Sequence, residues 1–306
     1  MGEQLLNSPK IFDIIISDFG REAAVKYVRS MAAHEREIIY ARLKTSRHKF
    51  YDEYRKIMFV LVGDIAYYKE SMIEKYKDKK YLDSGILIGI GKLEIPHEVK
   101  KRIIRCVMEQ VYLAVTRGYN NIRIIIPCNT LSQLLEGDLR KVISDTESLY
   151  KSIVKELCLD EQKAHIYSRL KNTFFRVCTV QSIILEEIRR YHGTQKKILI
   201  LGTSSSVKNY RTKIAKMKIL WNFNILGLSA SEQNLINNTV VAAVDEDKNT
   251  LKKLKQRIAT EIIKPRQHKF DDLLVVEACT DFDLGLGLNT REIFVRRLVN
   301  DVYEPE

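Results

Sequence analysis

Residues 121–132 read NIRIIIPCNTLS, and this stretch carries the pattern from which the fold is predicted. Its isoleucines form a short, apolar, β-branched run that Pro127 ends, which is typical of a buried strand. The strand delivers Cys128, Asn129 and Thr130 to the loop that follows. We therefore expect a thiol at the carboxyl end of a core strand.

The same pattern returns near the other end of the chain. The apolar run at residues 273–276 is followed by EACTD, which places Cys279, Thr280 and Asp281 at the end of a second expected strand. Two strand-end elements that each carry a cysteine and a threonine, far apart in the sequence, indicate two similar halves that face each other.

Expected strands alternate with expected helices along the chain, which predicts an α/β fold with parallel sheets covered by helices on both faces. Such sheets place active sites at the carboxyl ends of their strands, where Asp18 and Cys128 would both lie. A final amphipathic helix over residues 290–303 is expected to close back on the first half. The expected strands cover residues 11–16, 85–91, 122–126, 173–180, 196–202, 223–228 and 273–276.

The length of 306 residues favours two domains. We expect the first α/β lobe to cover residues 1–140 and 285–306 and the second to cover residues 141–284. Within the first lobe, residues 35–83 stand out as a helical, tyrosine-rich insertion. We interpret it as one or two amphipathic helices that pack on the core or on a second subunit, with a lid or a partner-docking surface as the alternative.

The composition, 45% hydrophobic and 29% charged, is that of an ordinary soluble globular protein. Lys and Arg number 51 against 39 Asp and Glu, and the net charge of +12 favours anions such as carboxylates. The charge is spread along the chain without a nucleic-acid-binding motif, so nucleic acid is not an expected partner. The N-terminal apolar segment, broken by Asp13 and Asp18, is too short for a signal peptide or a membrane span.

The five cysteines include no close pair and no C-x-x-C motif, so the sequence predicts neither a zinc site nor a disulfide framework. Reduced thiols fit a cytoplasmic protein best. We interpret Cys106, Cys158 and Cys178 as small buried apolar residues, and the six histidines as structural or surface residues.

Cys128 and Cys279 differ from the other cysteines because hydroxyl or amide residues follow each of them where a loop enters a helix. Backbone N–H groups at such a point stabilise an anion, and they can lower a thiol pKa from about 8.5 into the range of about 3.5–7.5. Asn129, Thr130 and Thr280 are then candidates to bind a substrate carboxylate through hydroxyl, amide and backbone donors.

The segments PCNT and ACTD, each after an apolar strand, resemble the two cysteine motifs of the cofactor-independent aspartate/glutamate racemase superfamily, usually seen as CNT and GCT. Residues 14–31 are similar to the first strand, turn and helix of that family. The segment KKILILGTSSSVKNY at residues 196–210 resembles its LLGT-type segment, and residues 225–237 resemble the stretch before its last helices. The chain thus resembles a divergent member of this superfamily over most of its length.

This resemblance implies two pseudo-symmetric, Rossmann-like domains with parallel sheets and an active site in the cleft between them. One cysteine, as thiolate, removes the proton from the carbon beside a carboxylate, and the other, as thiol, delivers a proton to the opposite face. No metal, nicotinamide or pyridoxal cofactor is needed. The resemblance also implies a small carboxylate substrate and a homodimer.

The residue roles that the resemblance implies fall into three groups. The catalytic residues are Cys128, Cys279 and Asp18. The substrate-binding residues are Asn129, Thr130, Thr203, Ser204 and Thr280. Ser17 and Asp281 are candidates to support them, with Asp281 standing where relatives carry Glu or His after GCT.

The chain also departs from the family pattern at positions that would bind a second carboxylate. Ser132 follows CNTL where aspartate racemases tend to have histidine, and Ser204 stands where they often carry lysine. The arginine that they place after an Ile-Pro pair is missing at Ile95 and Pro96. We therefore expect an intact site for the α-carboxylate and a side-chain pocket that is not built for aspartate.

Three functions remain open from the sequence. The first is a racemase or epimerase of an amino acid or a related small carboxylate. The second keeps the fold but is an isomerase or a decarboxylase of a small diacid that uses a cysteine as nucleophile or proton donor. The third is a non-catalytic, racemase-like scaffold that binds a partner through the insertion at residues 35–83.

Overall fold

The structure is a computed structural model. It describes residues 11–16, 21–43, 55–60, 97–157, 164–190, 197–217, 223–244, 247–279 and 284–303. The strand expected at residues 85–91 lies outside these ranges, as does the whole segment 61–96.

Two four-stranded parallel sheets form the framework of the described residues. In the first sheet the strand order is β2-β1-β3-β4, and in the second it is β6-β5-β7-β8. The first sheet contains β1 (Ile11–Ile16), β2 (Arg55–Val60), β3 (Asn121–Ile126) and β4 (Phe174–Thr179). The second contains β5 (Lys197–Leu201), β6 (Asn224–Ile225), β7 (Leu273–Glu277) and β8 (Leu288–Asn289).

The two sheets are built alike, because the second repeats the strand order of the first when each strand number is raised by four. Every neighbouring pair in both sheets is parallel. The prediction of an α/β fold with two similar parallel sheets is therefore confirmed. The strand expected at residues 223–228 is present, but it is only two residues long.

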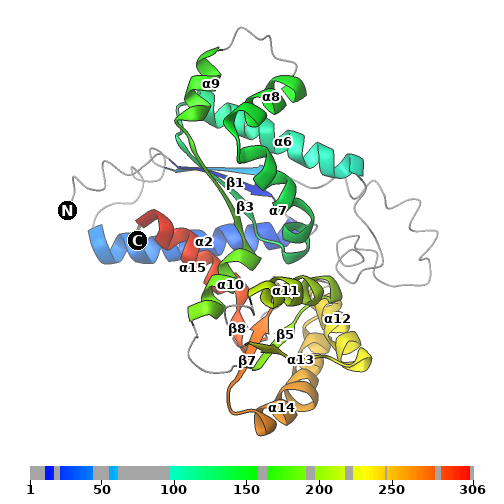
Figure 1. Cartoon of the computed structure of the whole chain (residues 1–306). Coiled ribbons are helices and arrows are strands. Elements are labelled where there is room, and N and C mark those ends of the chain that lie inside the picture. The colour runs from blue at the N-terminus through cyan, green and yellow to red at the C-terminus, as the bar shows by residue number, and fades with distance from the viewer. Residues whose placement is uncertain are drawn as a thin grey trace.

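Helices fill the connections between the strands (Figure 1). Those before β4 are α2 (Arg21–Leu43), α6 (His97–Thr116), α7 (Asn129–Ile143), α8 (Thr146–Leu157) and α9 (Ala164–Lys171). Those after β4 are α10 (Val180–Arg190), α11 (Ser204–Met217), α12 (Ala230–Val244), α13 (Lys248–Arg257), the π-helical turn η2 (Ile258–Ile263), α14 (Lys264–Lys269) and α15 (Thr290–Tyr303).

The helix α6 illustrates why these segments become helical. Pro96 precedes its first residue, where a missing backbone N–H costs nothing. Val99, Ile103, Val107 and Val111 then recur every four residues and are all buried. One face of the helix is therefore apolar, and it packs into the core of the first sheet.

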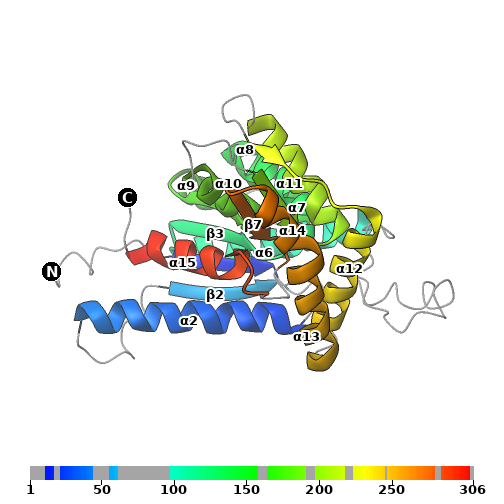
Figure 2. The same ribbon diagram turned by 90° about the horizontal axis from the view of Figure 1, so that it is seen from below.

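The C-terminal helix α15 joins the two halves. It follows β8 of the second sheet, yet it lies along α2, as Figures 1 and 2 both show. The rings of Phe294 in α15 and Tyr27 in α2 meet edge to face, with their centroids 5.8 Å apart. One core cluster includes Ile15 and Ile125 of the first sheet and Ile198 and Ile200 of the second. The prediction that this helix closes back on the first half is confirmed.

The insertion at residues 35–83 is not wholly helical, in contrast to the prediction. Residues 35–43 continue α2, but residues 55–60 form the strand β2, which pairs with β1 in register from Ile11 and Arg55 to Ile16 and Val60. A short apolar run such as KIMFV fits a strand or a helix equally well by its periodicity alone. Here the backbone hydrogen bonds available at the edge of β1 favour the strand.

The second sheet does not begin at residue 173, as the alternation of elements had suggested. The strand β4 instead pairs with β3, with Asn121 opposite Phe174 and Ile126 opposite Thr179. The first sheet therefore extends well past residue 140. The sequence shows that a strand is present, but it does not show which sheet edge offers the better partner.

A buried ion pair connects the first sheet to α15. Asp13 and Arg123 lie on neighbouring strands and are almost completely buried, and two hydrogen bonds of 2.7 and 2.8 Å join them. Arg123 Nη1 also donates to the carbonyl oxygen of Leu298, at 2.6 Å. Burial by itself lowers the pKa of Arg123, but the charge and the hydrogen bonds of Asp13 outweigh it and raise that pKa above its ordinary value.

We predict that Asp13→Asn lowers the free energy of unfolding by about 3–5 kcal/mol, because Arg123 then stays buried without its counter-charge. Urea denaturation measures this change. The control is Glu98→Gln, which removes an exposed ion pair with Lys101 and should cost less than about 1 kcal/mol. Equal effects of the two substitutions would contradict the role assigned to Asp13.

Candidate active site

The two cysteines occupy corresponding positions in the two sheets. Cys128 lies two residues after Ile126, the last residue of β3, and Cys279 lies two residues after Glu277, the last residue of β7. The strands β3 and β7 correspond in the strand orders. Both cysteines are at least nine-tenths buried, and neither is in a disulfide. The expected strand-end placement is therefore observed for both thiols.

A hydrogen bond brings the two cysteine-bearing segments together. Asn129, the residue after Cys128, donates from its amide nitrogen to the carbonyl oxygen of Ala278, at 3.0 Å. Ala278 is the residue before Cys279. The two segments are 149 positions apart in the sequence, and this contact joins the carboxyl end of one sheet to that of the other.

Two buried tyrosine hydroxyls hold the residues on either side of Cys128. Tyr210 in α11 donates to the amide oxygen of Asn129, at 3.0 Å, and Tyr27 in α2 donates to the carbonyl oxygen of Pro127, at 3.2 Å. Burial raises the pKa of Tyr210 above its ordinary value, so its hydroxyl remains a donor at neutral pH. Neither tyrosine stands out in the sequence as a site residue.

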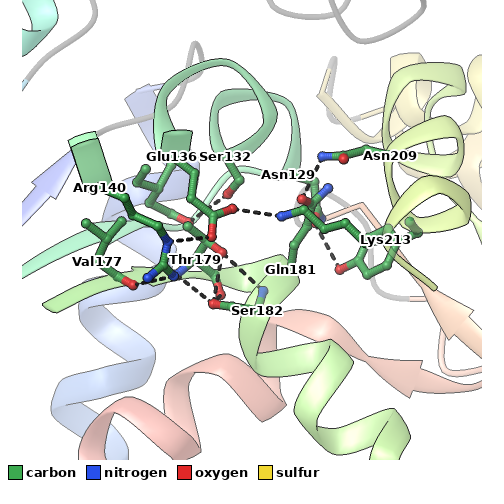
Figure 3. A network of polar contacts seen from close by, with 12 residues as sticks. Asn129, Ser132, Glu136, Arg140, Val177, Thr179, Gln181, Ser182, Asn209 and Lys213 are labelled. Atoms are coloured by element: carbon green, nitrogen blue, oxygen red, sulfur yellow. Dashed lines mark hydrogen bonds and ion pairs between the residues drawn. The ribbon is translucent and has the colours of Figure 1, made fainter. Parts of the chain in front are cut away.

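One polar face of α7 docks against α11. Asn129, Gln133 and Glu136 recur at helical spacing and so lie on the same face of α7. Ser205 donates to Gln133 at 2.6 Å, and Lys213 pairs with Glu136 at 2.8 Å. Figure 3 shows Asn129 and Glu136 both directed towards the side from which Lys213 approaches. The helix that begins beside Cys128 is thereby fixed against the second half.

The same face of α7 also contacts the first sheet. Arg140 pairs with Glu136 at 3.0 Å and donates to the carbonyl oxygen of Val177 in β4, at 3.2 Å (Figure 3). The carboxylate of Glu136 therefore pairs with Arg140 of its own helix and with Lys213 of α11.

The start of α7 is arranged to receive an anion. Cys128 has an extended backbone, with φ of −97° and ψ of 128°, and it directly precedes the first helical residue. The thiol thus lies at the positive end of a 15-residue helix. Thr130, in the first turn, is 7% exposed, and its hydroxyl makes no hydrogen bond to any described residue. This hydroxyl is available to a ligand.

The side chains of the other predicted substrate-binding residues that the structure describes already form hydrogen bonds within the chain. Both ends of the Asn129 amide are already hydrogen-bonded, which leaves one N–H for a ligand. The Thr203 hydroxyl donates to Ser206 at 3.0 Å at the start of α11, and Ser204 accepts a 3.4 Å bond from Asn237. Ser17, Asp18, Thr280 and Asp281 lie outside the described residues.

Gln233 and Asn237 of α12 form hydrogen bonds with the segment that follows β5, and neither residue stands out in the sequence. Gln233 donates to the carbonyl oxygen of Gly202, at 2.9 Å, and to Asn237, at 3.1 Å. A Cβ atom on Gly202 would lie 2.9 Å from the backbone oxygen of Ala278, so only glycine allows the two segments to approach this closely.

Glu277 organises the chain that follows Cys279. Its buried carboxylate accepts three backbone N–H bonds, from Leu284 at 2.9 Å, Leu286 at 2.6 Å and Gly287 at 3.0 Å. These bonds fix residues 284–287 to the end of β7. The sequence analysis treated Glu277 only as part of the strand, because such backbone contacts leave no residue pattern.

The remaining cysteines have the structural character that was expected where the chain is described. Burial raises the pKa of Cys178 to about 11, so it remains a thiol at neutral pH. Cys106 is half-buried in α6, and Cys158 lies outside the described residues. Among the described residues, no group of three His, Cys, Asp or Glu side chains could hold a metal ion, and no helix is long and apolar enough to cross a membrane.

No protein-family model and no curated protein matches the sequence. Among solved structures, an aspartate racemase from Picrophilus torridus is 13% identical and has a TM-score of 0.48, and the comparison covers 96% of this chain and 94% of that one. An aspartate racemase homologue from Pyrococcus horikoshii is 14% identical with a TM-score of 0.47, over 96% of this chain and 100% of that one.

We predict that Tyr210→Phe lowers the free energy of unfolding by about 1–3 kcal/mol, because the buried amide oxygen of Asn129 loses its donor. Urea denaturation again provides the measurement. The matched control is Tyr119→Phe, since the Tyr119 ring packs on Phe12 but its hydroxyl bonds to no described residue. A loss from Tyr210→Phe that does not exceed the control would show that this hydrogen bond is not holding Asn129.

Proposed function

We propose that this chain is a divergent member of the aspartate/glutamate racemase superfamily and a cofactor-independent racemase or epimerase. It moves the α-proton of an amino acid or a related small carboxylate with Cys128 and Cys279 as a thiolate/thiol pair. The observation that carries this proposal is the corresponding placement of the two thiols at the ends of β3 and β7, on segments joined by the bond from Asn129 to Ala278.

Two thiols suit inversion at carbon because the proton must leave one face and return to the other. In the proposed reaction, one cysteine thiolate takes the α-proton, and the electrons of the C–H bond pass into the adjacent carboxylate. The second cysteine then gives its proton to the opposite face of the planar carbanion. The two cysteines exchange roles in the reverse direction, so no other reactant is consumed.

The start of α7 is the proposed binding site for the substrate carboxylate. Backbone N–H groups there are free of helical partners, the helix dipole favours an anion, and the Thr130 hydroxyl is available. The same features stabilise a thiolate at Cys128. Asn129 contributes its remaining N–H, and Thr203, Ser204 and Thr280 are proposed as further substrate contacts.

Asp18 and Asp281 are proposed to assist proton movement at Cys128 and Cys279, respectively, with Ser17 supporting the first site. Asp18 follows β1, the strand beside β3, and comes two residues after its last residue, Ile16. This is the same offset at which Cys128 follows β3. The proposal therefore places the carboxylate and the thiol at one edge of the sheet.

The proposed substrate has no second carboxylate. The position at which aspartate racemases tend to carry histidine is here Ser132, which is fully buried and donates to the carbonyl oxygen of Cys128, at 2.8 Å. Its hydroxyl therefore stabilises the first turn of α7. Together with the pairing of Arg140 and Lys213 to Glu136, this favours an amino acid with an uncharged side chain. The homodimer and the cytoplasmic location stay predictions.

We predict that Cys128→Ala and Cys279→Ala each reduce inversion by at least about a hundredfold, because each removes the acid or base for one face of the carbon. Proton NMR in deuterated water, across a panel of amino acids and diacids, reports α-hydrogen exchange, and chiral chromatography reports inversion.

Cys106→Ala is the matched control, since Cys106 lies in α6, away from both strand ends, and it should invert at the wild-type rate. Full inversion by either Cys128→Ala or Cys279→Ala would refute the two-thiol mechanism. Release of carbon dioxide from a diacid without α-hydrogen exchange would instead identify a decarboxylase.

A further inference from the structure

A pocket of about 240 Å³ lies between α10 and α15, and neither of the two cysteine-bearing segments lines it. Figure 1 shows these helices side by side. Four residues of each helix line the pocket. They are Ile183, Glu186, Glu187 and Arg190 of α10, and Ile293, Arg296, Arg297 and Asn300 of α15.

The two walls of this pocket are equivalent in the pseudo-symmetry of the fold. Thr179 ends β4 opposite Ile126, and Asn289 ends β8 opposite Glu277. Both also cap the helix that follows, since Thr179 accepts from the Ser182 N–H and Asn289 accepts from the Glu292 N–H, each at 3.1 Å. Thr179 and Asn289 thus occupy the same structural position, 110 residues apart.

The same offset of 110 residues relates every lining residue of α10 to one of α15. The pocket therefore lies where the pseudo-twofold axis passes between the two helices. The equivalent pairs are Ile183 and Ile293, Glu186 and Arg296, Glu187 and Arg297, and Arg190 and Asn300.

Although the walls are equivalent in position, they are opposite in charge. The α10 wall carries the carboxylates of Glu186 and Glu187, and the facing positions of α15 carry guanidinium groups. Ion pairs run along the helices, from Arg190 to Glu187 at 3.4 Å, from Arg296 to Glu292 at 2.7 Å and from Arg297 to Asp301 at 3.1 Å. Glu186 pairs with no cation in the described part of the chain. The α10 side, which also carries Arg190, thus has a net negative charge from Glu186, and the α15 side presents the guanidinium groups of Arg296 and Arg297.

We propose that this pocket binds a small zwitterion that carries an ammonium and a carboxylate on one carbon, as a free α-amino acid does. The carboxylate would pair with Arg296 and Arg297, the ammonium would pair with Glu186 and Glu187, and the alkyl part would rest on Ile183 and Ile293. A simple anion meets the acidic wall, and a simple cation meets the basic wall. The volume lies below the usual range for drug-sized ligands, about 300–1,000 Å³, and suits a molecule of this size.

Three ligands of nearly the same shape test this proposal. The zwitterion 2-aminoisobutyrate has no α-hydrogen, so it cannot be racemised. Isobutyrate keeps only its carboxylate, and isopropylamine keeps only its amine. Methyl NMR of the isoleucine-labelled protein follows the resonances of Ile183 and Ile293, whose side chains line the pocket. We expect saturable shifts of both methyl signals with 2-aminoisobutyrate alone.

Variants separate this pocket from the proposed active site. The double variant Glu186→Gln/Glu187→Gln should bind 2-aminoisobutyrate at least about tenfold more weakly, since the ammonium loses both carboxylates. Glu98→Gln, on the surface of α6, and the double variant Cys128→Ala/Cys279→Ala should both bind as the wild type does. Absence of racemase activity would leave these expectations unchanged.

Three results would contradict the proposal that this pocket binds a zwitterion. They are no saturable shift with 2-aminoisobutyrate, equal shifts with isobutyrate or isopropylamine, and loss of the shifts in the double cysteine variant. The first would show that the pocket does not bind a zwitterion. The second would show that it does not distinguish a zwitterion from a simple ion. The third would show that the methyl signals report on binding at the cysteines.

Discussion

The hydrogen bond from Asn129 to the carbonyl oxygen of Ala278 is the contact on which the proposed active site depends. It joins the residue after one cysteine to the residue before the other, and the Tyr210 hydroxyl fixes the amide group that forms it. A buried amide with both ends bonded has one orientation, because rotation would leave polar atoms unpaired. The relative position of the two thiols is therefore set by polar contacts within the core.

The rest of the structure supports this contact from both sides. The face of α7 that begins at Asn129 continues through Gln133 and Glu136, which bind α11. On the other side, the ion pair of Asp13 and Arg123 connects the first sheet to α15, the helix that follows the second sheet. Buried polar pairs are costly when one partner is absent, so these pairs favour a single arrangement of the two halves.

Much of the framework could be predicted from the sequence, because isoleucine-rich runs such as the one before Cys128 have one clear structural meaning. The sheet to which each strand belongs could not be predicted in the same way, because pairing depends on which strand edge is available. The strand β4 was expected in the second half, but it pairs with β3 of the first sheet. The placement of both cysteines just after core strands could be predicted from their motifs. Tyr210, Gln233 and Glu277 were missed, since each acts through contacts with residues distant in the sequence or through backbone groups.

The central claim is that Cys128 and Cys279 face one small molecule from opposite sides. The most direct measurement is cross-linking of the native protein with 1,3-dichloroacetone, whose two reactive carbons can join thiols across a space of substrate size. Peptide mass spectrometry then locates the bridge. We predict a single intramolecular link between Cys128 and Cys279. Separate alkylation of both cysteines without a link, or a link from either one to another cysteine, would contradict the account.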